Sequence, residues 1–121
     1  MVKTILIADD DADVRGLVTE ILQNAGHRVC AVNDGGQVLA AADRVQPDLI
    51  ILDWVMPTTT GLEACMELRA LSRFTEIPIV FLTGRDLPLE MGLGFAAGAD
   101  EYLPKPFRPA DLRKLVDELL Y

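Results

Sequence analysis

Apolar segments of strand length alternate along the chain with segments whose apolar side chains follow a helical spacing. The strand-like runs lie at 4–8, 28–32, 48–52, 77–82 and 100–103. In the intervening segments apolar residues recur every three or four positions, which places them on one side of a helix. These helical stripes lie at 14–25, 38–45, 62–68 and 112–120, with Pro109 near the first turn of the last one. The pattern predicts a regular alternation of strands and helices.

Alternation of this kind is typical of right-handed βαβ crossovers, which build a parallel sheet with helices on both faces. Such a sheet is buried on both sides, and this explains why the strand-like runs are continuously apolar. A chain of 121 residues is long enough to bury a core of its own. We therefore predict an α/β fold in which residues 1–121 form one domain around a doubly wound five-stranded parallel sheet.

The connection between the fourth and fifth strands is less regular than the others. A helix is required between Asp86 and Ala97, but this segment contains Pro88, Gly92 and Gly94. An interior glycine costs about 1 kcal/mol relative to alanine, whereas a proline near the start of a helix is tolerated. Two interpretations remain open: a short or frayed helix held by tertiary packing, or an element that is poised to rearrange.

Acidic side chains follow two of the strand-like runs. Asp9, Asp10 and Asp11 come directly after the first run, and Asp53 follows the third. In an open parallel sheet, ligands bind in the crevice outside the carboxyl ends of the strands. Several unpaired carboxylates at that edge would repel one another unless a cation joined them. The sequence therefore predicts a divalent-metal pocket built from carboxylates.

Two further strand ends carry polar groups. Thr83 follows the fourth run and Lys105 follows the fifth, so a doubly wound sheet would gather both at the edge that holds the aspartates. Mg²⁺ prefers one or two carboxylates plus phosphate oxygens. A carboxylate can also act as the nucleophile that forms an aspartyl phosphate. The predicted set of carboxylates, hydroxyl and ammonium therefore suits phosphoryl transfer.

The composition limits which partners and which cellular compartment are expected. The net charge of −8 and the isoelectric point near 4.4 make direct contact with nucleic acid unfavourable. No apolar stretch approaches the roughly 20 residues that span a bilayer, and the first strand-like run begins too early to leave room for a signal peptide. We interpret Cys30 and Cys65 as small core residues and His27 as a surface loop residue. The expected compartment is the cytoplasm, which is reducing and rich in magnesium.

Four motifs, taken together, give the chain a resemblance to a known family. They are ILIADD at 5–10, LDWVMP at 52–57 followed by Gly61, LTG at 82–84 and GADEYLPKPF at 98–107. In this order and spacing the chain resembles the receiver domains of two-component response regulators, and the motifs span almost its whole length. The resemblance implies a flavodoxin-like sheet with the strand order 2-1-3-4-5 and five helices.

The resemblance implies a role for each residue at the predicted edge of the sheet. Asp53 would be the phosphoacceptor. Asp10 and Asp53 would bind Mg²⁺ together with the backbone carbonyl of Val55, and Asp9 would act through water. The metal would reduce the repulsion between the carboxylate and the phosphoryl group, and Lys105 would neutralise charge on the opposite side. Asp11 has no fixed role in the family and is expected to act as a charge at a helix N-terminus.

The resemblance also implies a conformational switch. Thr83 would donate a hydrogen bond to a phosphoryl oxygen and move toward it, and the exposed ring of Tyr102 would then move inward. This movement would bias a two-state equilibrium of the 84–107 surface. Tyr102 could instead be an ordinary half-buried aromatic of a strand. The resemblance further implies a cis peptide bond between Lys105 and Pro106.

The implied function is that of a signalling module that catalyses only its own phosphorylation and dephosphorylation. It would receive a phosphoryl group from a sensor histidine kinase or a phosphotransfer protein. It would control an effector domain or protein through the face formed by helix 86–97, the last strand and helix 109–120. Neither nucleic acid nor a membrane would be a direct partner.

Two alternatives belong to other functional classes. A Mg²⁺-dependent phosphatase of the haloacid dehalogenase type also forms an aspartyl phosphate, but it needs a second acid where this chain has Val55. A receiver-like interaction domain that is never phosphorylated is the other alternative, and the complete set of site residues argues against it.

The chain departs from the family pattern at the rim of the predicted site. Thr60 stands where an acidic residue is frequent, and we expect little effect on the chemistry because the position lies in a loop. Val55 and Arg85 are expected to flank the entry to the site and to alter access of water.

Overall fold

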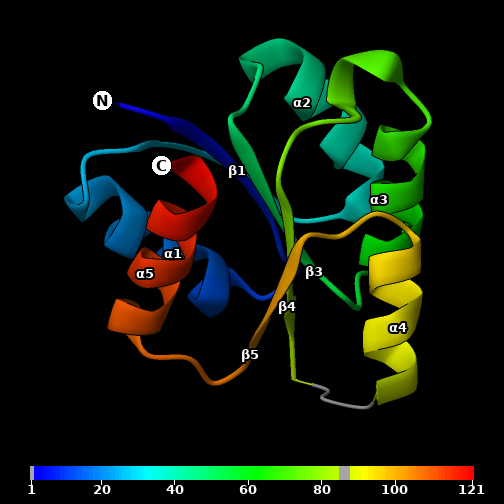
Figure 1. Cartoon of the computed structure of the whole chain (residues 1–121). Helices are drawn as coiled ribbons and strands as arrows, with labels where there is room; N and C mark the ends of the chain where they lie inside the picture. The colour runs from blue at the N-terminus through cyan, green and yellow to red at the C-terminus, as the bar shows by residue number, and fades with distance from the viewer. Residues whose placement is uncertain (1, 85–87) are drawn as a thin grey trace.

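The computed structural model describes residues 2–84 and 88–121 and contains one sheet of five parallel strands between two layers of helices (Figure 1). The strands are β1 (Thr4–Ala8), β2 (Arg28–Val32), β3 (Leu49–Asp53), β4 (Ile79–Thr83) and β5 (Glu101–Pro104). Their order in the sheet is β2-β1-β3-β4-β5. The predicted α/β class, the parallel sheet and the strand order are confirmed.

Five α-helices cover the sheet within the described residues, as predicted. They are α1 (Ala12–Asn24), α2 (Val38–Val45), α3 (Gly61–Arg69), α4 (Pro88–Ala96) and α5 (Pro109–Leu120). Figure 1 shows α1 and α5 on one face of the sheet and α2, α3 and α4 on the other. The chain is therefore doubly wound, and the carboxyl ends of all the strands lie at one edge.

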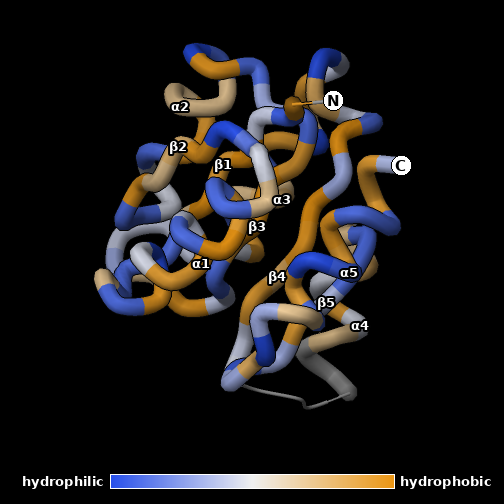
Figure 2. The backbone as a smooth tube through the Cα atoms, turned by 90° about the vertical axis from the view of Figure 1, so that its left-hand side faces the viewer, coloured by the Kyte–Doolittle hydropathy of each residue, from blue (hydrophilic) through white to orange (hydrophobic). Residues whose placement is uncertain are grey.

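Each face of the sheet has its own core, because neighbouring residues of a strand point to opposite sides. Leu6 and Ile50 belong to the core on the side of α2 and α3, whereas Ile5 and Ile51 belong to the core on the side of α1 and α5. All five residues of β3 are buried, as expected for the central strand. Figure 2 shows strongly hydrophobic colour along the central strands and mixed colours along the helices.

The beginnings of two helices fix the loops that surround the strand ends. Asp11 caps α1, since its carboxylate accepts hydrogen bonds from the amides of Asp13 and Val14. Thr60 caps α3 and forms a reciprocal capping box with Glu63. The predicted use of Asp11 as a charge at a helix N-terminus is confirmed. The capping box explains why a threonine suits position 60, a reason that our sequence analysis missed.

Some element boundaries differ from the predicted ones. β4 begins at Ile79, two residues later than predicted, because Pro78 has no N–H to donate to a strand ladder. β3 and β5 are each displaced by one residue from the predicted ranges. Residues 85–87 lie outside the described part of the chain, and they include Arg85 and the first residues of the predicted helix 86–97.

The interpretation of His27 as a surface loop residue is wrong, because its side chain is only 8% exposed. Gly26 has a φ of 96°, a conformation that suits glycine. After this turn the amide of His27 donates to the carbonyl of Leu22 at 3.0 Å, which keeps the residue against α1. Its Nδ1 has no hydrogen-bond partner among the described residues.

Both cysteines are free thiols. The interpretation as a core residue is confirmed for Cys65, whereas Cys30 is half-buried and packs against the edge of the core. Cys65 lies on the buried side of α3, and burial raises the pKa of its thiol to about 11. Among the described helices, none is long and apolar enough to cross a membrane.

Candidate functional site

The carboxyl ends of four neighbouring strands bring the predicted site residues together. Asp53 is the last residue of β3 and Thr83 is the last residue of β4. Asp9 directly follows β1, and Lys105 directly follows β5. Asp9 is fully buried, and Asp53 and Thr83 are 7% and 3% exposed. Asp9, Asp53 and Thr83 are therefore buried at this edge of the sheet rather than in open solvent.

Three carboxylates form an acidic group at this edge. Oxygen atoms of Asp9, Asp10 and Asp53 all lie within 4.8 Å of one another. Asp10 is exposed, whereas the other two are buried. Oxygen donors at this spacing, on one side open to solvent, suit a small hard cation such as Mg²⁺, which keeps several water ligands. The donor set thus fits the predicted metal.

The ammonium of Lys105 joins two of these carboxylates. Its Nζ donates to Asp9 Oδ2 at 2.9 Å and to Asp53 Oδ1 at 3.0 Å. The other oxygen of Asp9 accepts the amide of Asp11 at 2.9 Å. Among the described residues, Asp53 Oδ2 has no hydrogen bond, so this oxygen is available to an incoming group. The Lys105–Pro106 peptide bond is cis, as the resemblance implied.

The electrostatics of the group are unfavourable without a further cation. Burial raises the pKa of Asp53 to about 6, and the hydrogen bond from Lys105 opposes this shift while the charges of Asp9 and Asp10 add to it. Burial disfavours the charged form of Lys105, but its bonds to Asp9 and Asp53 prevail and raise its pKa. Two carboxylates therefore share one ammonium with a third carboxylate close by, and a divalent cation would relieve the excess negative charge.

Val55 lies in the loop between β3 and α3, two residues after Asp53. The side chain of Val55 is 54% exposed. Farther along the loop, Asp34 Oδ1 accepts the amides of Thr58 and Thr59 at 3.1 and 3.3 Å. Gly35 packs so closely on the carbonyl of Thr59 that no Cβ would fit. Our sequence analysis missed the role of Asp34, because no local pattern relates two segments separated by about 24 residues.

Tyr102 differs from the prediction. We predicted an exposed ring for Tyr102, and this is wrong, because the residue is only 9% exposed. It packs against Phe81 and Phe95 with ring centroids at 5.5 and 5.1 Å. Its hydroxyl donates to the carbonyl of Met91 in α4 at 3.1 Å. The physical reason is that Gly94 of α4 has no side chain where the tip of the ring lies. Tyr102 is therefore more deeply buried than either interpretation assumed.

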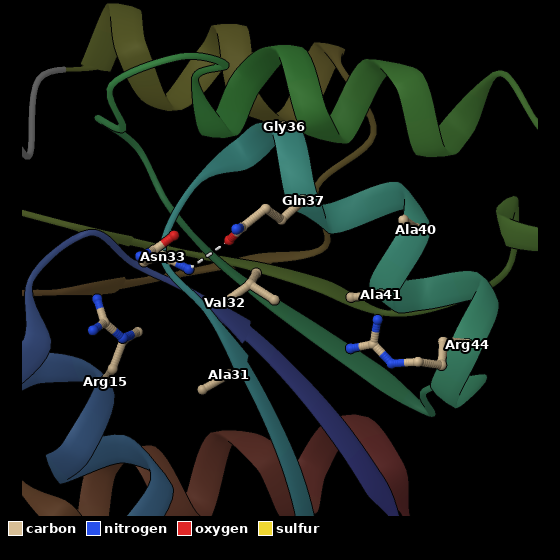
Figure 3. Close-up of a pocket in the computed structure, with 9 residues that line it drawn as sticks. All are labelled: Arg15, Ala31, Val32, Asn33, Gly36, Gln37, Ala40, Ala41 and Arg44. Carbon is tan, nitrogen blue, oxygen red and sulfur yellow. Dashed lines mark hydrogen bonds between the residues drawn. The ribbon is translucent and has the colours of Figure 1, made fainter.

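A pocket of about 540 Å³ lies over the edge of β2, between α1 and α2 (Figure 3). Arg15 and Arg44 stand on opposite sides of it, and Asn33 and Gln37 lie at one end. None of the three clustered carboxylates lines this pocket. Arg15 connects the two regions, since its Nη1 donates to the carbonyl of Asp9 at 2.9 Å. The pocket is a neighbour of the acidic group and does not contain it.

Comparison with known proteins gives one consistent result. The profile of the response regulator receiver domain matches residues 5–117. The DNA-binding response regulator MtrA of Mycobacterium tuberculosis is 38% identical over 112 residues, which cover 93% of this chain and 48% of MtrA. The chain thus spans about half the length of this relative.

Two solved structures are similar over nearly the whole chain. Chemotaxis protein CheY4 of Vibrio cholerae superposes with a TM-score of 0.95 at 36% identity, covering 99% of this chain and all of CheY4. The receiver domain of the sensor histidine kinase PA1611 of Pseudomonas aeruginosa gives 0.91 at 30% identity, covering 99% and 98% of the two chains. A magnesium ion is coordinated in the active-site cleft of that receiver domain.

Proposed function

The chain belongs to the response regulator receiver domains, and from this membership we propose that Asp53 accepts a phosphoryl group in a Mg²⁺-dependent reaction. Receiver domains are signalling modules rather than catalysts for other substrates, and they partner with histidine kinases and effectors. The observation that carries the proposal is the bridge from Lys105 to Asp9 and Asp53 beside the third carboxylate, Asp10. We propose that residues 1–121 act as one receiver domain.

We propose that Asp10, Asp53 and the backbone carbonyl of Val55 hold the magnesium ion, with Asp9 acting through water. When bound, the ion supplies positive charge that reduces the repulsion between two anionic reactants. The proposal is supported by the shared position of Asp9, Asp10 and Asp53 at one strand edge. It is also supported by the raised pKa of Asp53, which burial and the neighbouring carboxylates cause.

In the proposed reaction, a carboxylate oxygen of Asp53 attacks the phosphorus atom of a phosphohistidine. A P–O bond forms as the P–N bond breaks, and the histidine of the donor leaves with its ring nitrogen free to take a proton. Lys105 already holds Asp53 Oδ1, which directs the other oxygen toward the donor. Its ammonium then neutralises charge on the phosphoryl group, as fixed positive charges do in other phosphoryl-transfer sites.

Thr83 is proposed to donate its hydroxyl hydrogen bond to a phosphoryl oxygen. Its position at the end of β4, beside the end of β3, supports this role. The amide of Lys105 donates to the carbonyl of Thr83 at 2.7 Å, so a movement of Thr83 reaches β5 directly. We propose that phosphorylation in this way stabilises the buried position of Tyr102 and switches the 84–107 surface. Residues 85–87 of this surface lie outside the described chain.

The proposed partners are a sensor histidine kinase or phosphotransfer protein upstream, and an effector domain or protein downstream. The effector is proposed to bind the face formed by α4, β5 and α5, where Leu93 and Phe95 are 47% and 44% exposed. The net charge of −8 supports a domain that does not itself touch nucleic acid. We propose that the domain works in the cytoplasm and not at a membrane.

Incubation with acetyl phosphate and Mg²⁺, followed by intact-mass measurement, tests the proposal. We expect a gain of one phosphoryl group that disappears in Asp53→Asn and without the metal. Asp43→Asn is the matched control, because it removes the same charge from an acid that bonds to Arg73 away from the site. If the chain takes up no phosphoryl group although it binds Mg²⁺, it is the non-phosphorylated interaction domain instead.

A further inference from the structure

Two glycines of α4 differ sharply in their surroundings. A Cβ added to Gly94 would collide with the hydroxyl of Tyr102 and would lie 3.2 Å from Phe81 Cε2. A Cβ added to Gly92 would have no atom within 4 Å. Both glycines weaken a helix to a similar extent, but packing requires only Gly94.

The buried ring of Tyr102 lies directly against this helix. Its hydroxyl donates to the carbonyl of Met91 at 3.1 Å, and Met91 precedes Gly94 by three residues. Residues three apart lie on the same side of a helix. The tip of the ring therefore reaches the backbone of α4 at the place where Gly94 has no side chain, a close approach that only glycine permits.

The same ring links the acidic site to the surface of α4. Trp54, which follows Asp53, lies 6.4 Å from Tyr102 between ring centroids. On the other side, Tyr102 lies 5.1 Å from Phe95, which is 44% exposed. The position of the Tyr102 ring therefore decides whether the aromatic contacts are continuous from the site to the proposed partner face.

We propose that Gly94 is a positioning residue that holds Tyr102 in its buried position without phosphorylation of Asp53. The inference rests on the proposed function only in treating Tyr102 as the switch residue. Phosphorylation then stabilises a ring position that the missing side chain of Gly94 makes available. The partner face is accordingly formed in part before any signal arrives.

Alanine at position 94 would place a methyl group where the hydroxyl of Tyr102 now lies. The ring is rigid, so it can avoid the methyl group only by rotating out toward solvent as a whole. Overpacking of this kind shifts an equilibrium by about tenfold or more. Alanine at position 92 meets open space and should leave the ring in place.

Fluorine NMR on the full chain labelled with 3-fluorotyrosine tests the proposal. The chain has two tyrosines, and a Tyr121→Phe variant assigns their signals. Tyr121 is 67% exposed and serves as the solvent-exposed reference. Without metal or phosphodonor, we expect the signal of residue 102 to be insensitive to exchange of H₂O for D₂O in the wild type and in Gly92→Ala. In Gly94→Ala we expect it to become as sensitive as that of Tyr121.

A solvent-sensitive signal of residue 102 in the wild type, or an insensitive one in folded Gly94→Ala, would overturn the proposal. If Gly94→Ala does not fold, the double variant Gly94→Ala/Tyr102→Leu decides the question. Recovery of the fold would support the collision with the ring, and continued unfolding would contradict it. Phosphoryl uptake, measured separately by mass, can fail or succeed independently of this result.

Discussion

Two groups of oppositely charged side chains in this molecule have nearly the same geometry. Arg73 bonds to Asp43 at 2.7 and 3.0 Å, and Lys105 bonds to Asp9 and Asp53 at 2.9 and 3.0 Å. The side chains of Arg73 and Asp43 are 49% and 44% exposed. Those of Lys105, Asp9 and Asp53 are 22%, 0% and 10% exposed. The groups differ in burial and not in bond length.

Burial reverses the direction of the pKa shift of the carboxylate in the two groups. The hydrogen bond from Arg73 lowers the pKa of Asp43, as expected for an ion pair in solvent. In the buried group, burial raises the pKa of Asp53 to about 6 although Lys105 bonds to it equally closely. A short ion pair is therefore no sign of function by itself. A buried carboxylate whose pKa the fold raises is a better indication of a functional site.

The largest expected effect comes from removing the shared cation. Lys105→Met would leave two buried carboxylates without their ammonium, and loss of one partner of a buried pair costs about 3 kcal/mol or more. We expect urea denaturation at pH 7.5 without metal to show a loss of this order. Lys114→Met, at an exposed position of α5, is the control. An equal loss of stability in both variants would show that burial of the Lys105 group has no special effect.

Asp53→Asn should increase the free energy of unfolding, whereas Lys105→Met should decrease it. The pKa of Asp53 is raised from 3.8 to about 6 by burial. Below about pH 4 the folded and unfolded chains both carry the proton, and the shift has no effect on stability. Between these values the folded chain keeps a proton that the unfolded chain releases, so stability falls as the pH rises.

Above about pH 6 Asp53 is charged in the folded chain as well, and the loss of stability is complete. A pKa shift of this size corresponds to about 3 kcal/mol of unfolding free energy. Without metal, we therefore expect Asp53→Asn to be more stable than the wild type at pH 7.5 by up to that amount. The gain should vanish near pH 4. Denaturation curves at the two pH values check this, and a variant that is less stable at pH 7.5 would show that the site is not strained.

The affinity for Mg²⁺ should depend on pH for the same reason. A proton on Asp53 competes with the metal, so affinity should fall as the pH drops through about 6, the raised pKa that burial causes. We expect a loss approaching about tenfold per pH unit below that point. Trp54 adjoins Asp53, and its fluorescence can report the titration. A flat profile between pH 5 and 7 would place the ion away from Asp53.

The smallest expected effect is at the exposed pair. Asp43→Asn should change the denaturation midpoint little, because solvent screens the pair. Its Mg²⁺ affinity should equal that of the wild type. The small effect should shrink further in high salt. A large loss of metal affinity in this variant would mean that long-range charge, and not the geometry of the buried group, determines binding.

Much of the fold and the acidic site could be predicted because each depends on local patterns. Continuous apolar runs marked the buried strands, and the aspartates that follow β1 and terminate β3 had to meet at one edge of a parallel sheet. The lysine that joins them lies 52 residues beyond Asp53. Its position after the last predicted strand was sufficient to place it.

The features that the sequence did not reveal depend on close approach between distant segments. The bonds from Asp34 to the loop of Thr58 and Thr59 have no local signature. From the sequence, Gly94 only destabilises its helix, whereas in the structure its missing side chain makes room for the ring of Tyr102. For the same reason the buried position of that ring was predicted wrongly. The spacing of apolar residues indicates which face of a helix is buried. It does not indicate where a small residue allows a distant side chain to approach.

A crystal structure of the chain with Mg²⁺ and beryllofluoride, a mimic of the phosphoryl group, tests the central claim most directly. We predict beryllium bonded to a carboxylate oxygen of Asp53, and a magnesium ion at about 2.1 Å from oxygens of Asp10, Asp53 and Val55. The Lys105 ammonium should contact a fluoride. Beryllofluoride on another residue, or a metal ion that does not touch Asp53, would contradict the account.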